Sequence, residues 1–518
     1  MPHLFGMDRY DSCLSADDGL YCVVKLDLYP GKASELMQLI KEYSAYTQKH
    51  YNYTYIERGL YDYLYHQTDT IENATNENRL LMNFSLRKNW RDLVKSEVND
   101  SRHNSLKGLH GIRSVTACLM IIAHVIFINS MGFIDQPRNF EKAYETLHFH
   151  LVFNGLMIVQ IFFFMAAFLQ AYYIQIGSET ERITWSQLPK LLFARWWRLT
   201  PANAVMIGFS ATWMRHLGSG PLWKHYVSEG VVAQCRRFWY LHLAYLNNYQ
   251  PEDKLCAVQT WHVAADTQMF VFTMLIYLAT MSRGRSLALS VLLLMSIAAP
   301  ALHVWLQDMD AMVLQTPEVY RHWSDRTFHN MHIHGHNNLS SYVIGLGIGT
   351  LVYNWQKKKR WGALSWLIIP AMGFLFLTGR GFYGEGERAS LGVRLLYAGT
   401  HRAAMGLLSA AAAISVTMRL SESFCNFFEW DGWLVPSRLS YSVYLLHMNL
   451  VHILMGLKTQ LGLVSLFNML VVYFGVVAIS LAMALPFYLV VEAPMTGLLK
   501  ISSSPIKHES RRRRTGRR

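Results

Sequence analysis

The chain has 518 residues, of which 52% are hydrophobic and 16% are charged. A soluble protein of this length would be less apolar, so the composition indicates that much of the chain lies in a lipid bilayer. The formal net charge is +13, but much of it lies in short clusters beside apolar runs, at 357–360 and 511–514. Such clusters are typical of the cytosolic flanks of membrane helices, and no basic stripe with exposed aromatics indicates a nucleic-acid partner.

The first 105 residues have a mixed, polar character. One amphipathic stretch at 33–43 has apolar residues at helical spacing, so we expect 1–105 to hold a small soluble domain or a remnant of one, with a linker. No charged segment followed by an apolar run opens the chain, and no signal peptide is predicted. Sequons for N-glycosylation begin at Asn52, Asn73, Asn83 and Asn99.

From residue 106 to 498, apolar runs of roughly 18 to 25 residues alternate with short charged gaps. We therefore predict an all-α polytopic membrane protein with about ten transmembrane helices, followed by a basic cytosolic tail at 499–518. The expected helices span 112–133, 151–174, 199–217, 261–281, 286–306, 338–354, 361–378, 391–417, 438–457 and 464–491. Lys and Arg fall in alternate gaps, which predicts that both ends of this region are cytosolic and that the 218–260 loop lies outside.

Two pairs of cysteines are closely spaced within polar segments. Cys235 and Cys256 lie in the predicted outer loop, and Cys13 and Cys22 lie near the N-terminus. Each pair is a disulfide candidate in an oxidising compartment, with free thiols as the alternative.

Ionisable residues inside membrane helices are expensive to bury, so each is a candidate functional residue. His124 lies among apolar residues of the first predicted helix, either as a general base or as a hydrogen-bonded packing residue. Arg195 and Arg198 share one helical face before the third helix, where they either bind phosphates or anchor the cytosolic end. Asp266 opens the fourth helix and either pairs with an arginine, orients His124 or faces the outer loop.

Other polar residues are weaker candidates from sequence. Trp261 and Gln268 flank Asp266, His447 lies in the ninth predicted helix, and Glu492 lies at the end of the tenth. Each is equally explained by helix packing, by the aromatic belt or by a helix terminus.

A histidine-rich run lies at 328–338. Its members are His329, His332, His334 and His336. Alternate histidines can bind zinc, but no Cys or Glu completes a familiar ligand spacing. We therefore expect a solvated polar loop here and no metal site.

Taken in order, these segments resemble the membrane acyltransferase-3 family over almost all of residues 106–498. LHGIRSVTACLMIIAH carries the first-helix histidine at His124, ARWWRLTP is the Arg-x-x-Arg element with its proline, and TWHVAADTQMF is the Trp-x(4)-acid-x-Gln element. The later signatures SYVIGLGIGTLV, SRLSYSVYLLH and VEAPM follow, and they contain Tyr342, His447 and Glu492. The Asp at position 266 and the loop CRRFWYLHLAYLNNY are similar to the animal branch called nose resistant to fluoxetine proteins.

The resemblance implies transfer of an acyl group from an acyl-CoA-like donor to a hydroxyl or amine acceptor, with a lipid as one candidate. It implies that Arg195 and Arg198 bind donor phosphates, that His124 deprotonates the acceptor and that Asp266 orients or charges the site. Acyl-CoA is then a co-substrate, membrane lipids are partners, and no bound cofactor is expected. The alternative is a lipid or small-molecule transporter on the same helix bundle, because buried ionisable residues also serve transport.

Two departures from the family pattern affect these expectations. The branch has a signal peptide and an extra membrane helix before the first acyltransferase helix, so we expect a shortened product or an incomplete gene model. Asn338 and Ser341 stand where the family has an Arg and a Pro in the approach to Tyr342, which bears on activity rather than on the fold. The expected location is the plasma membrane or an endomembrane.

Overall fold

The structure is a computed structural model in which the chain forms two units, residues 1–82 and residues 83–518. It describes 81–503 except for 96–104, 131–133, 136, 182, 252–253, 281, 317–318, 320–324, 356–364, 385–387 and 464, and it describes three strands before residue 81. These strands, β1 (Phe5–Met7), β2 (Tyr21–Asp27) and β3 (Tyr55–Tyr61), form one sheet in the order β1-β3-β2. Strand β3 pairs parallel to β1 and antiparallel to β2.

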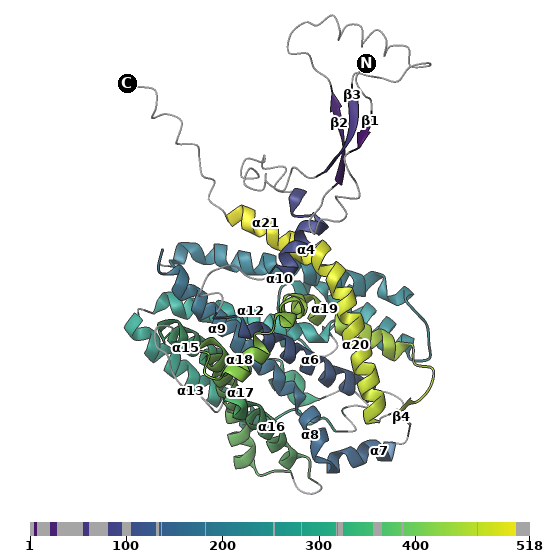
Figure 1. Ribbon diagram of the computed structural model, residues 1–518. Coiled ribbons are helices and arrows are strands. Elements are labelled where there is room, and N and C mark those ends of the chain that lie inside the picture. Colours follow the sequence, from purple (N-terminus) through teal and green to yellow (C-terminus); the bar gives the residue numbers. More distant parts are fainter. Residues whose placement is uncertain are drawn as a thin grey trace, which may run out of the picture. The chain divides into compact units, whose positions relative to one another are not determined.

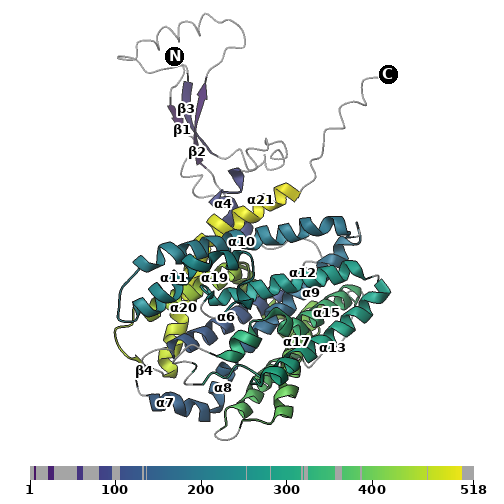
Figure 2. The ribbon, with the colours of Figure 1, turned by 180° about the vertical axis from the view of Figure 1, so that it is seen from behind.

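The second unit is a bundle of helices (Figures 1 and 2). Each predicted membrane helix corresponds to one helix of the bundle, and these are α6 (Gly108–Asn129), α9 (Val159–Gly177), α10 (Leu188–Thr212), α12 (Trp261–Ala279), α13 (Ser282–Gln307), α15 (Leu339–Trp355), α16 (Ile368–Thr378), α17 (Leu391–Thr417), α19 (Leu434–Gly456) and α20 (Leu466–Phe487). The other helices are α4 (Leu86–Val94), α7 (Pro137–Glu141), α8 (Leu147–Phe153), α11 (Ala233–Leu243), α18 (Glu422–Phe428) and α21 (Ala493–Ser503). Two short strands, β4 (Ile134–Asp135) and β5 (Gly462–Leu463), pair in parallel.

The number of helices that cross the membrane differs from this count. Among the described residues, six helical stretches are long and apolar enough to cross, or seven if one pair bent by 96° counts as a single span. The membrane class is therefore supported, whereas ten crossings are not confirmed. Helix α10 carries three basic residues, α15 has only 17 residues, and α17 and α19 belong to the bent pair, so none of them meets the length and hydropathy criteria alone.

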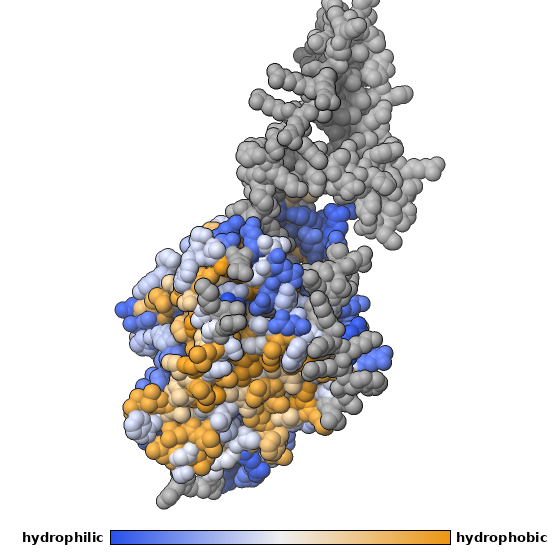
Figure 3. Space-filling view, turned by 90° about the vertical axis from the view of Figure 1, so that its left-hand side faces the viewer, coloured by the Kyte–Doolittle hydropathy of each residue, from blue (hydrophilic) through white to orange (hydrophobic). Residues whose placement is uncertain are grey.

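The surface of the bundle is suited to lipid. Leu294, Phe374 and Phe467 are 69%, 70% and 79% exposed, although water would disfavour such large apolar side chains. Figure 3 shows hydrophobic residues gathered across the middle and lower part of one side of the bundle, with hydrophilic residues above them. By contrast, the span that contains α9 is 72% buried, so α9 is an interior helix.

Helix α9 packs closely against α15, and residues of both helices contribute to two core clusters. Gly345 and Gly349 of α15 face the carbonyl oxygens of Phe164 and Phe168, and a β-carbon at either glycine would collide with them. Small residues four apart let membrane helices approach closely, because lipid provides no hydrophobic force between helices. Substitution of either glycine would therefore separate the two helices.

Helix α4 packs on the bundle, although it lies upstream of the boundary expected at residue 106. Asn89 donates hydrogen bonds to the carbonyl oxygens of Asn83 and Leu489, both at 3.0 Å. Arg438 of α19 donates to the carbonyl oxygen of Leu93 at 2.7 Å. The sequon residue Asn83 is only 3% exposed, so its side chain is not accessible for glycosylation in this fold. The other three sequons lie outside the described residues.

Charged side chains join the end of α13 to the start of α17. Arg394 is 7% exposed and donates to Asp308 Oδ1 and to the carbonyl oxygen of Met309, both at 2.8 Å. Arg388 contacts the other carboxylate oxygen of Asp308 at 3.0 Å. The hydrogen bond from Arg394, together with the charge of Arg388, lowers the pKa of Asp308 below its ordinary value.

We expect Asp308→Asn to lower the melting temperature of the purified chain at neutral pH, because Arg394 loses its charged acceptor. Asparagine tolerates the φ of 46° at residue 308. A carboxylate with a lowered pKa stabilises the fold above its unfolded pKa, and this contribution is lost as the pH falls through the folded pKa. The difference between wild type and variant should stay constant from about pH 8 to 5 and shrink below about pH 4. An undiminished difference at about pH 3 would contradict this origin.

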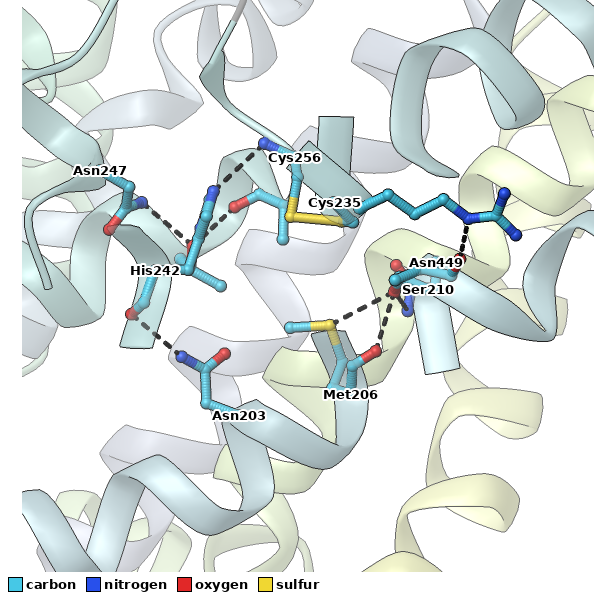
Figure 4. Close-up of a disulfide and its surroundings, with 12 residues drawn as sticks. Asn203, Met206, Ser210, Cys235, His242, Asn247, Cys256 and Asn449 are labelled. Carbon is cyan, nitrogen blue, oxygen red and sulfur yellow. Dashed lines mark hydrogen bonds between the residues drawn. A yellow bond between two sulfur atoms is a disulfide. The ribbon is translucent and has the colours of Figure 1, made fainter. Parts of the chain in front are cut away.

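A disulfide fixes the 218–260 segment. Cys235 of α11 is joined to Cys256, as Figure 4 shows, and both residues are buried. The N–H of Cys256 donates to His242 Nε2 at 3.2 Å, so His242 Nδ1 carries the proton and donates to Thr260 Oγ1 at 2.7 Å. Burial lowers the pKa of His242 to about 4, so this histidine is a neutral link between the loop and α12.

Replacing both Cys235 and Cys256 by serine is expected to destabilise the chain by about 3 kcal/mol, the loop-closure value for residues 21 apart. Thermal unfolding in detergent, with and without reductant, measures the loss. Cys118→Ser is the control, because Cys118 is a free thiol and the disulfide remains. If reductant lowered the melting temperature of the double variant as much as that of wild type, the disulfide would not be the source of the stability.

Candidate functional site

His124 of α6 and His447 of α19 form a hydrogen-bonded pair inside the bundle. Their Nδ1 and Nε2 atoms are 2.9 Å apart, and the two rings stack with centroids at 5.1 Å. His447 is 1% exposed. Two residues that are more than three hundred positions apart in the chain thus meet at one point.

The carbonyl oxygen of Val443 determines the tautomers of the pair. It lies 3.0 Å from His447 Nδ1, and because a carbonyl only accepts, His447 carries its proton on Nδ1. His447 Nε2 then accepts from Nδ1–H of His124. This assignment leaves Nε2 of His124 with a free lone pair, as a general base requires.

A cavity of about 50 Å³, here called the His124 cavity, lies on one side of the pair. Its walls include His124 and Trp261 from the helices, and Gln315, Asp325 and His329 from the segment between α13 and α15. Burial raises the pKa of Asp325 above its ordinary value. Polar groups of a connecting segment therefore line the same space as His124.

A second cavity, here called the His447 cavity, has a volume of about 150 Å³. It is lined by His447, Arg113, His262 and Asp266, with Tyr441 and Tyr444. Along α6 this cavity is bordered by residues 113–121, and the His124 cavity is bordered by residues 123–124. The two cavities thus follow one another along the helix, and the histidine pair lies between them, with His124 in the wall of one and His447 in the wall of the other.

Asp266 and Arg195 form an ion pair with side chains 14% and 20% exposed. The guanidinium of Arg195 also lies over the ring of Phe270, at 4.3 Å. Asp266 therefore pairs with an arginine, and it does not hydrogen-bond to His124. Arg198 is exposed and makes no ion pair with a described residue, so the two arginines have different environments despite their shared face.

Most of the weaker candidates form hydrogen bonds to other segments of the bundle. Gln268 donates to the carbonyl oxygen of Tyr245 at 2.8 Å, and Tyr342 donates to Gln170 Oε1 at 2.6 Å. Trp261 is 6% exposed and lines the His124 cavity. Glu492 lies in a π-helical turn (Tyr488–Glu492) and accepts a hydrogen bond of 2.6 Å from Ser442 of α19.

Asn338 and Ser341, which depart from the family pattern, connect neighbouring segments through hydrogen bonds. Asn338 donates to the carbonyl oxygens of His332 and His334, at 2.7 and 2.9 Å, and accepts from Gln160 at 2.6 Å. Ser341 donates to the carbonyl oxygen of Arg402 at 2.8 Å. These bonds fold the histidine run back onto α9 and α17.

The expectation of a solvated histidine loop was wrong for its central part. His332 is only 6% exposed, and its neighbours Met331 and Ile333 are fully buried. The ring of His332 stacks on Phe328 at 5.6 Å and meets Trp261 edge-on at 5.0 Å. Apolar residues alternate with the histidines in this run, and burial of these apolar residues places His332 in the core.

Sequence reasoning missed three intramembrane residues of this region. Arg113 and His262 line the His447 cavity, and His262 stacks on Phe163 at 4.5 Å. Arg402 is 2% exposed within α17, and its hydrogen bond among the described residues is to the carbonyl oxygen of Ala398, at 3.4 Å. All three are ionisable residues inside apolar runs, which is the signal that identified His124. Cys13, the side chain of Cys22 and the basic clusters at 357–360 and 511–514 lie outside the described residues.

A lipid-facing helical bundle with a hydrogen-bonded histidine pair between two internal cavities is the architecture of an integral membrane protein. An acyltransferase domain of the membrane acyltransferase-3 type matches residues 106–489. The chain therefore belongs to the membrane acyltransferase-3 family, as its motifs indicated.

One relative is nose resistant to fluoxetine protein 6 of Caenorhabditis elegans. It is 22% identical over 411 residues, which cover 71% of this chain and 47% of the relative. The chain thus spans about half the length of that relative. No solved structure matches the chain.

Proposed function

We propose that the protein is a membrane acyltransferase that moves an acyl group from an acyl-CoA-like donor to a hydroxyl or amine acceptor. The observation that carries the proposal is the hydrogen bond between His124, which lines one cavity, and His447, which lines the other. One cavity can admit the donor and the other the acceptor, so that both meet at the free Nε2 of His124. The family membership supports the same class of reaction.

In the proposed reaction, His124 Nε2 takes the proton of the acceptor hydroxyl or amine. The acceptor oxygen or nitrogen attacks the thioester carbonyl carbon, and a carbon–oxygen or carbon–nitrogen bond forms as the carbon–sulfur bond breaks. The thiolate leaves and takes the proton back from His124. His447 accepts the Nδ1–H bond of His124, which fixes the ring and disperses the positive charge of the imidazolium.

The donor would enter the His447 cavity from the cytosol. Arg113 in its wall and the exposed Arg198 are guanidinium groups that suit phosphates. Arg195 is neutralised by Asp266, so we assign this pair to shaping the cavity rather than to binding the donor. A space of about 150 Å³ holds a group of roughly benzene size, which suits a thioester with a few carbons of acyl chain.

Acyl transfer by the purified full chain in liposomes tests the proposal. Radiolabelled acetyl-CoA and butyryl-CoA are supplied on one side, and labelled acyl groups on lipids and on added amine or hydroxyl acceptors are measured. The proposal predicts acceptor acylation that consumes acyl-CoA. Movement of a solute or lipid without donor consumption, and no acylated product, would favour the transporter instead.

A further inference from the structure

Three histidines cluster away from the site described above. His303 lies in the last turns of α13. His334 lies directly before the 3₁₀ turn Gly335–Asn338 that precedes α15, and His336 lies in that turn. One ring nitrogen from each of the three lies within 4.8 Å of the others. His334 and His336 are 5.4 Å apart between ring centroids, and His303 and His336 are 5.1 Å apart.

The rings of this cluster are held in place by neighbours. The ring of Tyr249 stacks on His334 at 4.6 Å, and its hydroxyl lies 2.9 Å from His336 Nδ1. The side-chain amide of Asn337 lies 3.2 Å from His303 Nδ1. The Tyr249 hydroxyl can accept from Nδ1–H of His336, as partners that orient the imidazole ligands of metals do. The Asn337 amide instead donates to His303 Nδ1, so this contact restrains the ring of His303 and occupies its Nδ1 lone pair.

The cluster also contains polar atoms that lack partners. Nδ1 of His334 and Oδ1 of Asn337 are buried and have no hydrogen-bond partner among the described residues. Buried polar atoms in native proteins are normally satisfied by protein, water or an ion. The cluster is therefore incomplete without a further group.

We propose that His303, His334 and His336 form a binding site for a divalent transition metal, with zinc as the expected ion. Imidazole nitrogen is a preferred ligand of zinc, and three such ligands with one open position are a known zinc arrangement. Zn–N bonds of about 2.0–2.1 Å place ligand nitrogens roughly 3.4 Å apart, so the rings, whose nitrogens lie within 4.8 Å of one another, move together by at most about 1.4 Å on binding. The bound ion would link the end of α13 to the segment before α15. The proposal does not depend on the acyl-transfer assignment.

The test is zinc binding by the purified full chain. The chain is purified with an affinity tag that contains no histidine, and bound metal is first removed with EDTA. Metal content after gel filtration and calorimetric titration with Zn²⁺ give stoichiometry and affinity, with Ca²⁺ as the ion that should not bind. We expect one zinc per chain in wild type and at least a tenfold weaker affinity in His336→Ala. Tyr249→Phe keeps the ring stacking and removes the hydroxyl, so it should weaken binding to a lesser degree.

His216→Ala is the matched control, because His216 is exposed and lies outside the cluster. It should bind zinc as wild type does. The proposal is overturned if wild type binds no stoichiometric zinc, which would mean that only water fills the cluster. It is equally overturned if His336→Ala and Tyr249→Phe both keep the wild-type affinity and stoichiometry.

Discussion

His124→Ala is expected to lower acyl transfer by about 10²–10⁴-fold, with little change in the folding of the chain. The variant removes the Nε2 lone pair that accepts the acceptor's proton. Transfer is measured with labelled acyl-CoA in liposomes, and the melting temperature in detergent reports on folding. His216→Ala, an exposed histidine, is the control and should transfer at the wild-type rate. Transfer at the wild-type rate by His124→Ala would show that this histidine is not the base.

Variants of His447 test whether this residue positions His124 or only supports the fold. His447→Ala should lower the rate less than His124→Ala, since the base remains but loses its fixed tautomer. His447→Gln supplies an amide oxygen in place of Nε2 and should restore part of the rate. Because the two rings act as one unit, the double variant His124→Ala/His447→Ala should be no slower than His124→Ala. If the rate losses of the two single variants multiplied in the double variant, the two histidines would act independently, which would contradict the proposed pair.

Asp266→Asn is expected to be the most destabilising single change at the site. It keeps the size of the side chain but leaves the guanidinium of Arg195 without its counter-charge in a mostly buried position. Loss of one partner from a buried ion pair costs about 3–5 kcal/mol, and partial exposure places this pair toward the lower end. Thermal unfolding in detergent measures the loss, and transfer should fall as well because Asp266 lines the His447 cavity.

A double-mutant cycle identifies the source of that loss. Asp266→Asn combined with Arg195→Met removes both charges, so the double variant should be more stable than Asp266→Asn alone. Glu229→Gln is the control, because its ion pair with Lys224 is exposed, at 63% and 81%, and should contribute about 0–1 kcal/mol. Equal stability of Asp266→Asn and wild type would mean that the pair does not hold α10 to α12.

The helices could be predicted from sequence because apolar runs of membrane length are a strong local signal. The predicted ten crossings are not confirmed, because α10, α15, α17 and α19 do not each form a span that is long and apolar enough alone. The sequence also does not show which spans are interior, since the spans containing α9 and α20 have mean hydropathies of 1.8 and 2.3, yet they are 72% and 17% buried. Burial of this kind is a property of the packed bundle rather than of one segment.

Several members of the candidate site were predicted from sequence, and pairing of Asp266 with an arginine was among the expected alternatives. Position within apolar runs identified His124, Asp266 and, more weakly, His447, but Arg113 and His262 were missed. No local pattern indicates that His447 supplies the partner of His124, because the two residues lie on separate helices far apart in the chain. Helical spacing placed Arg195 and Arg198 on one face, but the contact with Asp266 from α12 distinguishes them.

The measurement that tests the account most directly is the structure of the full chain with a non-hydrolysable acyl-CoA analogue. We expect the phosphates to lie against Arg113 and Arg198, and the acyl carbonyl to lie in the His447 cavity beside the histidine pair. The carbonyl carbon would then be accessible to an acceptor held by Nε2 of His124. Donor density that leaves the histidine pair out of reach of the carbonyl would contradict the proposed reaction.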